Sequence, residues 1–120
     1  MRCYSWNVNG IRAVARKELL PWKQLPRADV FCLQETKAHI EQLDPEVAEP
    51  KGWHAYYSTT QRKGYSGVAI ISRKEPDEVV EGLGVRKLDQ EGRVLRARYD
   101  DLLVISAYFP KSQPEGPRFE

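Results

Sequence analysis

The sequence predicts an α+β fold, in which a mixed β-sheet carries helix on its outer side. The first third of the chain alternates strand, helix and strand, and the remainder contains several short apolar runs joined by tight polar turns. The last of these runs, residues 102–109, is almost wholly apolar, as expected for a core strand. This order of elements favours helices packed on a sheet over an all-α or all-β arrangement.

The amino-terminal elements follow directly from residue types. Residues 2–8 are rich in aromatic and β-branched side chains and predict a strand, which Asn9-Gly10 ends with a strong turn signal. Residues 11–25 show helical spacing in part, and Pro21 is expected to break or kink that helix. Residues 30–34 predict the second strand.

The rest of the chain predicts strands separated by polar turns. Residues 44–52 contain two prolines and predict a loop with at most a short helical turn. The later predicted strands cover residues 54–59, 68–72, 76–83 (an edge strand), 93–99 and 102–109. The last run is typical of a strand covered on both faces. Residues 110–120 predict no element, and a complete domain rarely ends so soon after its best core strand. We therefore expect the chain to be part of a larger domain.

Composition permits a folded core but indicates no function. The chain has 120 residues, of which 41% are hydrophobic and 30% charged, and its net charge is +2, too small to indicate nucleic acid by itself. No apolar run is long enough to span a membrane, and no secretory signal is visible. Cys3 and Cys32 lie in strand-like stretches, so we expect two buried thiols in a reducing compartment, by default the cytoplasm.

Glu35 is the most informative single residue. It follows the buried run Val30-Phe31-Cys32-Leu33-Gln34 with no turn residue between. Desolvating such a carboxylate costs several kcal/mol unless it is paired, hydrogen-bonded or bound to a cation. One interpretation is a salt bridge with Lys37 or Arg12, or simple exposure at the strand end. The other is a ligand of a hard cation, because Mg²⁺ is usually held by one or two carboxylates with water and phosphate.

The other short motifs are weak when each is taken alone. Asn7-Val8-Asn9-Gly10 suits an ordinary turn and lacks the glycine spacing of a phosphate-binding loop. Gly64-Tyr65-Ser66-Gly67 is a turn, and Tyr108 would be a packing residue with a wet end. The residues alone therefore leave the function open.

In order along the chain, however, five segments resemble one family. They read "SWNVNGIR", "DVFCLQETK", "GYSGVAIISR", "DQEGRV" and "ISAYFP". Together they are similar to the exonuclease III class of apurinic/apyrimidinic endonucleases, within the deoxyribonuclease I-like endonuclease/exonuclease/phosphatase superfamily. The third and fourth segments resemble the DNA-repair branch in particular.

The resemblance implies a fold and a domain boundary. The family fold is a four-layer α/β sandwich, two mixed β-sheets packed face to face with helices outside. Residues 1–120 would form the amino-terminal portion of one such domain, with most of one sheet and a strand of the other. The carboxyl-terminal portion is expected to be missing, since the family's Gly-Asp-x-Asn and terminal Ser-Asp-His segments do not occur in the chain.

The resemblance also implies roles for seven residues. Glu35 matches the metal-binding glutamate, for Mg²⁺ or Mn²⁺, and Asn9 sits where relatives have Asn or Asp near the metal. Tyr108 matches the tyrosine beside the scissile phosphate, and Asn7 matches the asparagine that orients the catalytic aspartate. The remaining three match DNA-contacting positions: Arg12, Tyr65 and Lys111, the last departing from the Asn or Gln of many relatives.

The implied activity is that of a base excision repair nuclease. It would hydrolyse the phosphodiester 5′ to abasic sites in double-stranded DNA, with 3′ exonuclease and 3′ phosphodiesterase activity, in the cytoplasm, at the nucleoid or in the nucleus. The isolated chain is expected to be inactive without the missing portion. The alternatives are a non-catalytic module that binds DNA or protein, and a phosphatase of the same superfamily.

Overall fold

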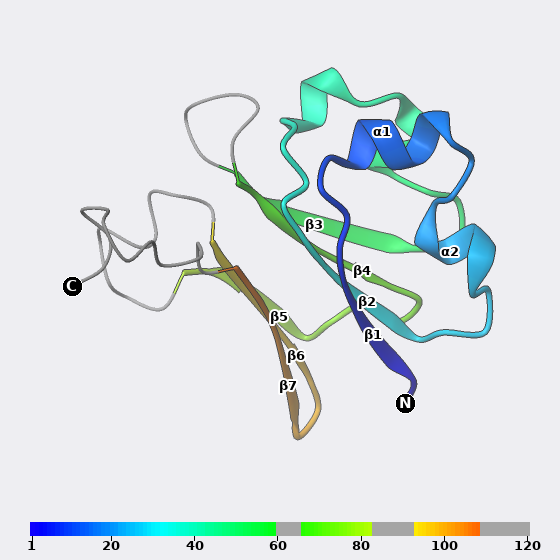
Figure 1. The fold of residues 1–120 in the computed structure, drawn as a ribbon. Helices are drawn as coiled ribbons and strands as arrows, with labels where there is room; N and C mark the ends of the chain where they lie inside the picture. Colours follow the sequence, from blue (N-terminus) through cyan, green and yellow to red (C-terminus); the bar gives the residue numbers. More distant parts are fainter. Residues whose placement is uncertain (60–65, 83–92, 109–120) are drawn as a thin grey trace, which may run out of the picture.

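Two β-sheets pack against each other in the fold (Figure 1). The structure, a computed structural model, describes residues 1–59, 66–82 and 93–108. The first sheet, sheet A, has the strand order β1-β2-β4-β3, in which β1 pairs parallel with β2 and the other pairs are antiparallel. The predicted mixed sheet is confirmed. Its strands are β1 (Cys3–Asn7), β2 (Val30–Gln34), β4 (Val68–Ser72) and β3 (His54–Ser58).

The second sheet, sheet B, is antiparallel with the order β5-β6-β7. Its strands are β5 (Glu78–Glu81), β6 (Val94–Tyr99) and β7 (Leu102–Ala107). The predicted edge strand is confirmed as β5. The expectation that the chain supplies only one strand of the second sheet is wrong, because a tight turn at Asp100-Asp101 pairs β6 with β7, and β5 then adds to β6.

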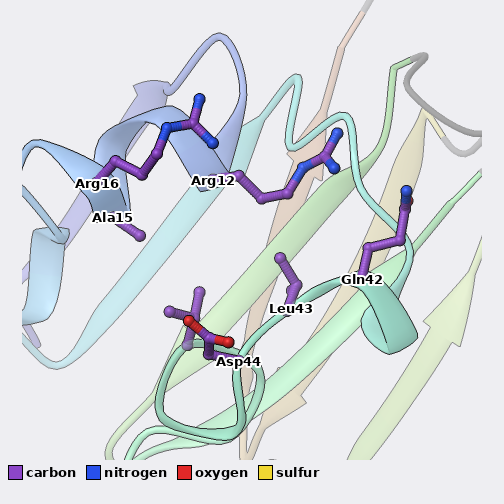
Figure 2. Close-up of a pocket in the computed structure, with 7 residues that line it drawn as sticks. Arg12, Ala15, Arg16, Gln42, Leu43 and Asp44 are labelled. Atoms are coloured by element: carbon purple, nitrogen blue, oxygen red, sulfur yellow. The ribbon is translucent and has the colours of Figure 1, made fainter.

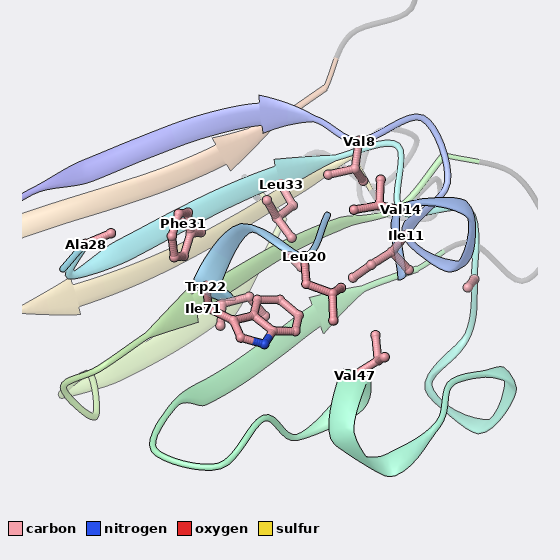
Figure 3. Close-up of a cluster of buried hydrophobic side chains, with 12 residues drawn as sticks. Val8, Ile11, Val14, Leu20, Trp22, Ala28, Phe31, Leu33, Val47 and Ile71 are labelled. Carbon is pink, nitrogen blue, oxygen red and sulfur yellow. The ribbon is translucent and has the colours of Figure 1, made fainter. Parts of the chain in front are cut away.

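Strands β2 and β4 are buried on both faces and separate two apolar layers. Successive side chains of a strand point to opposite faces, so alternate residues enter different layers. One layer lies between sheet A and the helices and includes Ile11, Val14, Trp22, Phe31, Leu33 and Ile71 (Figure 3). The other joins the two sheets and includes Val30, Cys32, Val68, Ile70, Leu95, Ala97, Tyr99 and Val104.

The helices are short and cover one face of sheet A (Figure 1). The predicted break in residues 11–25 is confirmed, and Pro21 lies at the first turn of the second helix, where its missing N–H costs nothing. The single helical turn expected within residues 44–52 is also confirmed. The helices are α1 (Ile11–Arg16), α2 (Pro21–Gln24), η1 (Ile40–Gln42, a 3₁₀ turn) and α3 (Pro45–Ala48).

Two expectations about burial are wrong. The apolar run in β7 is not covered on both faces, because Val104 and Ser106 are buried while Leu103 and Ile105 are 52% and 48% exposed. Cys3 is exposed, since β1 is an edge strand whose five residues are all exposed. Cys32 is buried as expected, and burial raises the pKa of its thiol to about 11.

The helices of the described residues include none long and apolar enough to cross a membrane.

Candidate active site

The carboxyl ends of β1 and β2 lie side by side because the two strands are parallel and Asn7 pairs with Gln34. The pairing continues beyond the strands. Gly10 N donates to the carbonyl of Glu35 at 2.7 Å, and Ile11 N donates to the carbonyl of Thr36 at 3.0 Å. Residues 7–11 therefore run along the end of β2 rather than making a hairpin turn. This places Asn7, Asn9 and Glu35 at one edge of sheet A.

The backbone at the end of β2 is strained, and hydrogen bonds to the residues before β4 hold it in place. Glu35 and Lys37 have φ angles of 54° and 55°, in the left-handed region, which costs roughly 1–2 kcal/mol for each non-glycine residue. Thr36 N donates to Gly67 O at 3.1 Å and Lys37 N donates to Ser66 O at 2.8 Å. Such strain persists only where neighbouring contacts determine it, and it concentrates at functional sites.

The carboxylate of Glu35 has no ion pair among the described residues, although two cations lie nearby. Lys37 Nζ instead donates to Asn9 Oδ1 at 2.6 Å, and Arg12 Nη2 lies 3.5 Å from the carbonyl oxygen of Lys37. The alternative that Glu35 forms a salt bridge with Lys37 or Arg12 is therefore wrong for this structure. Glu35 is half-buried, so its charge is available to a cation at the end of the strand.

Both asparagine side chains are engaged within the loop after β1. Asn7 Oδ1 accepts a hydrogen bond from Asn9 N at 3.0 Å, which is the local bond that stabilises an Asx turn. The Asn9 amide oxygen accepts from Lys37. Together with the backbone bonds from Val8, Gly10 and Ile11, these bonds hold the loop against the end of β2.

Hydrogen bonds of Ser106 connect the end of β7 to the end of β2. Gln34 Nε2 donates to Ser106 Oγ at 3.3 Å, and Ser106 Oγ donates to the carbonyl of Leu33 at 3.1 Å. The arrows of β1, β2 and β7 point the same way (Figure 3). Glu35 follows Gln34 by one residue and Tyr108 follows Ser106 by two, so both come just after the hydrogen-bonded pair. Tyr108 is half-buried, and its N–H donates to Arg93 O at 2.8 Å.

Arg12 extends from α1 beside this edge. With Arg16, Gln42 and Asp44 it lines a groove between α1 and α3, and Figure 2 shows both guanidinium groups directed away from Asp44. Of the other two predicted DNA contacts, Tyr65 and Lys111 lie outside the described residues.

The donors at this edge fit a magnesium-type ion only in part. The described residues contain no group of three or more His, Cys, Asp or Glu side chains that could hold a metal. Mg²⁺, however, keeps several waters and is often bound by one or two carboxylates together with substrate phosphate. Glu35, a carboxylate with no ion pair among the described residues, suits that role and supplies one ligand rather than a complete cage.

Four residues that shape this edge were not predicted from the sequence. Ser106 contacts Gln34 across 72 positions and Lys37 contacts Asn9 across 28, so no local spacing could indicate either pair. Thr36 and Gly67 lie within recognised segments, but only the fold shows that they touch. The glycine at the end of the predicted turn was the one signal in the sequence, since a turn glycine often allows close backbone approach.

The fold and the candidate site together define a class of protein. In this class two β-sheets pack together, and polar residues gather at the ends of the strands. A sequence profile described as the Endonuclease/Exonuclease/phosphatase family matches residues 4–119. The chain belongs to the endonuclease/exonuclease/phosphatase family, whose enzymes are typically metal-dependent.

Similar curated proteins are nucleases of the exonuclease III and apurinic/apyrimidinic endonuclease type. The chain is 43% identical over 114 residues to an exodeoxyribonuclease from Bacillus subtilis, covering 94% of this chain and 44% of that protein. It is 39% identical over 114 residues to the DNA repair nuclease APEX1 of Danio rerio, covering 93% of this chain and 37% of that protein. The chain thus spans less than half the length of these relatives.

Solved structures agree with the sequence comparison. The catalytic domain of APE2 from Xenopus laevis superposes with a TM-score of 0.80 at 35% identity, covering 98% of this chain and 48% of that one. The 3′-5′ exonuclease NExo from Neisseria meningitidis gives a TM-score of 0.73 at 31% identity, covering 90% and 41%. The mixed sheet A, the antiparallel sheet B and the short helices therefore match part of a known catalytic domain.

Proposed function

We propose that this chain is the amino-terminal portion of a metal-dependent DNA repair nuclease. The intact protein would hydrolyse the phosphodiester 5′ to abasic sites in double-stranded DNA and would remove nucleotides and blocking groups from 3′ ends. One observation carries the proposal. An acid without an ion pair among the described residues, Glu35, stands where the ends of β1, β2 and β7 meet. The names of the relatives support the nuclease assignment.

Glu35 would bind Mg²⁺ or Mn²⁺, with Asn9 close to the ion. A bound divalent ion polarises a phosphoryl oxygen and offsets the negative charge that develops during hydrolysis. The hydroxyl of Tyr108 would donate a hydrogen bond to the same phosphate, a form of charge stabilisation that is strongest when the donor is already in position. Asn7 would orient a catalytic aspartate supplied by the rest of the domain.

DNA would be held mainly through its phosphates. Arg12 is exposed beside the site, and Tyr65 and Lys111 are the further proposed contacts. Such contacts position the duplex without reading its sequence, and they make affinity fall as salt rises. This suits an enzyme that must find a lesion in any sequence, at the nucleoid of a bacterium or in a nucleus.

The test is completion of the domain. The 120-residue chain is assayed alone and joined to the carboxyl-terminal remainder of its domain, on a duplex with one abasic site and on an unmodified duplex. We expect no nicking by the chain alone and Mg²⁺-dependent nicking 5′ to the lesion by the joined protein. Nicking by the chain alone would refute the role of a missing portion.

The same assay separates the two alternatives. A superfamily phosphatase would ignore abasic DNA and release phosphate from a phosphoinositide. A non-catalytic module would bind the duplex without cutting it, and Glu35→Ala would leave that binding unchanged. Either result from the joined protein would contradict the proposed nuclease.

A further inference from the structure

We propose that Gly67 is a positioning residue for Glu35. The absence of a side chain at position 67 lets the chain entering β4 pack directly on Thr36, and this contact sets the backbone that presents the Glu35 carboxylate. The inference deepens the proposed function, and its metal-binding part rests on that proposal.

The close approach at Gly67 is specific. Gly67 has a φ of 90°, and its carbonyl accepts the hydrogen bond from Thr36 N. A Cβ built at this position would collide with Thr36 Oγ1, and it would also lie 3.5 Å from Lys37 N and 3.7 Å from Ser58 O. The position therefore lies between the ends of β2 and β3, with no room for a methyl group.

Thr36 has little freedom to move aside. Its side chain is fully buried at 0% exposure, and branching at Cβ restricts its χ1 rotation. Its N–H is bonded to Gly67 and its carbonyl to Ile11 N, both near 3 Å. Its hydroxyl has no hydrogen-bond partner among the residues that the structure describes. Because Thr36 is fully buried in close-packed surroundings, its side chain has little space to rotate into, and we expect a methyl group at position 67 to displace the backbone of Thr36.

Displacement of Thr36 passes directly to Glu35. Both neighbours of Thr36, Glu35 and Lys37, hold left-handed φ angles that are not favoured by their own residue types. The carbonyl of Glu35 is also bonded to Gly10 N at 2.7 Å. A shift at Thr36 would release this strained pair toward ordinary conformations, and the carboxylate would leave the edge shared with Asn7 and Asn9.

Gly52 provides a matched control. It also has a left-handed φ, 86°, but a Cβ built there meets nothing within 4 Å. Gly67→Ala and Gly52→Ala therefore share the intrinsic cost of alanine at positive φ. Only Gly67→Ala adds the collision with Thr36.

The experiment uses NMR on the 120-residue chain in dilute solution. Amide exchange of Gly10 and Ile11 reports their bonds to Glu35 and Thr36 without any metal, and added Mn²⁺ broadens amide signals near the carboxylate that binds it. For Gly67→Ala we expect exchange at these two amides to rise roughly tenfold, as for a weakened hydrogen bond, and the broadening around Glu35 to disappear. Gly52→Ala should leave both unchanged.

The double variant Thr36→Ala/Gly67→Ala tests the cause. Removing the hydroxyl should restore the protection of Gly10 and the Mn²⁺ broadening to the level of Thr36→Ala alone. Equal behaviour of Gly67→Ala and Gly52→Ala would overturn the proposal. If Gly67→Ala does not fold, recovery in the double variant supports the proposal, and failure of the double variant to fold contradicts it.

Glu35→Gln separates this inference from the proposed function. If the parent chain and Glu35→Gln show the same Mn²⁺ broadening, Glu35 is not a metal ligand and the proposed function loses its main support. The exchange of Gly10 still decides whether Gly67 positions the backbone at Glu35.

Discussion

At the scale of single residues, Glu35 differs from the other surface acids. It is half-buried at the end of a core strand, in a left-handed conformation, and among the described residues no cation pairs with it. Two nearby cations are directed elsewhere, Lys37 to Asn9 and Arg12 to a backbone carbonyl. A carboxylate that lies on strained backbone and has no ion pair among the described residues is a candidate for a functional role.

The first prediction concerns the stability of Glu35→Gln. Since the charge makes no ion pair with a described residue and glutamine has nearly the same shape as glutamate, the substitution should change the free energy of unfolding by less than about 0.5 kcal/mol. Urea unfolding followed by circular dichroism measures this. A loss above roughly 2 kcal/mol would mean that the carboxylate has a structural partner.

The second prediction concerns Cys32. Burial raises the pKa of its thiol from 9.0 to about 11, so between these values the folded chain keeps a proton that the unfolded chain loses. The free energy of unfolding should therefore fall as pH rises through this window. Unfolding in urea across this range measures the slope, which should persist in Cys3→Ala and shrink in Cys32→Ala. An unchanged slope in Cys32→Ala would assign it to other groups.

Residue-scale prediction from sequence succeeded where chemistry was local and failed where contacts were distant. The carboxylate at the end of a strand was visible in the sequence, because a charge after five core positions is unusual. Its lack of an ion pair was not visible, because the partners of Lys37 and Arg12 depend on how residues 9–12 cross the end of β2. Cys3 was misjudged because strand composition does not reveal which strand lies at an edge.

At the scale of elements, the link between the two sheets matters most for the site. Ser106 is fully buried and connects β7 to β2 through Gln34 and the carbonyl of Leu33. Residue types and turn signals in the sequence identified the seven strands of the described residues to within a few residues. The hairpin of β6 and β7 at Asp100-Asp101 was predicted and is confirmed. The contact of Ser106 with β2 was not predicted, since a serine within an apolar run gives no sign of the strand it will face.

The third prediction follows from this link. Ser106→Ala removes a buried hydroxyl that both donates and accepts, so it should lower the free energy of unfolding by about 1–3 kcal/mol. Ser5→Ala is the matched control, because Ser5 bonds the same glutamine from an exposed position. Its effect should stay below about 0.5 kcal/mol. Equal effects of the two substitutions in urea unfolding would show that the inter-sheet bond is not the stabilising one.

At the scale of the whole molecule, sheet B carries apolar side chains that no described residue covers. Helices pack on sheet A, and among the described residues none packs on the outer face of sheet B, where Leu103 and Ile105 are half-exposed. Contiguous exposed apolar surface of this kind marks an interaction site or an aggregation hazard.

The fourth prediction is therefore self-association of the 120-residue chain. Its average mass in sedimentation equilibrium should rise with concentration, and Leu103→Lys/Ile105→Lys should return it toward the monomer without loss of fold. Ile40→Lys is the control, because Ile40 is 51% exposed but lies in η1, on the helical side. A chain that remains monomeric at high concentration, or an equal effect of the control, would contradict this account of the outer face of sheet B.

The central claim is that Glu35 supplies the metal ligand for phosphodiester hydrolysis. The most direct measurement is the rate of nicking of an abasic-site duplex by the chain joined to the remainder of its domain, against Mg²⁺ concentration. Glu35→Gln should lower that rate by a factor on the order of 10²–10³, the loss typical for a residue that stabilises transition-state charge. Glu46→Gln, an exposed acid on α3, should leave it unchanged. Equal rates for Glu35→Gln and the parent protein would contradict the claim.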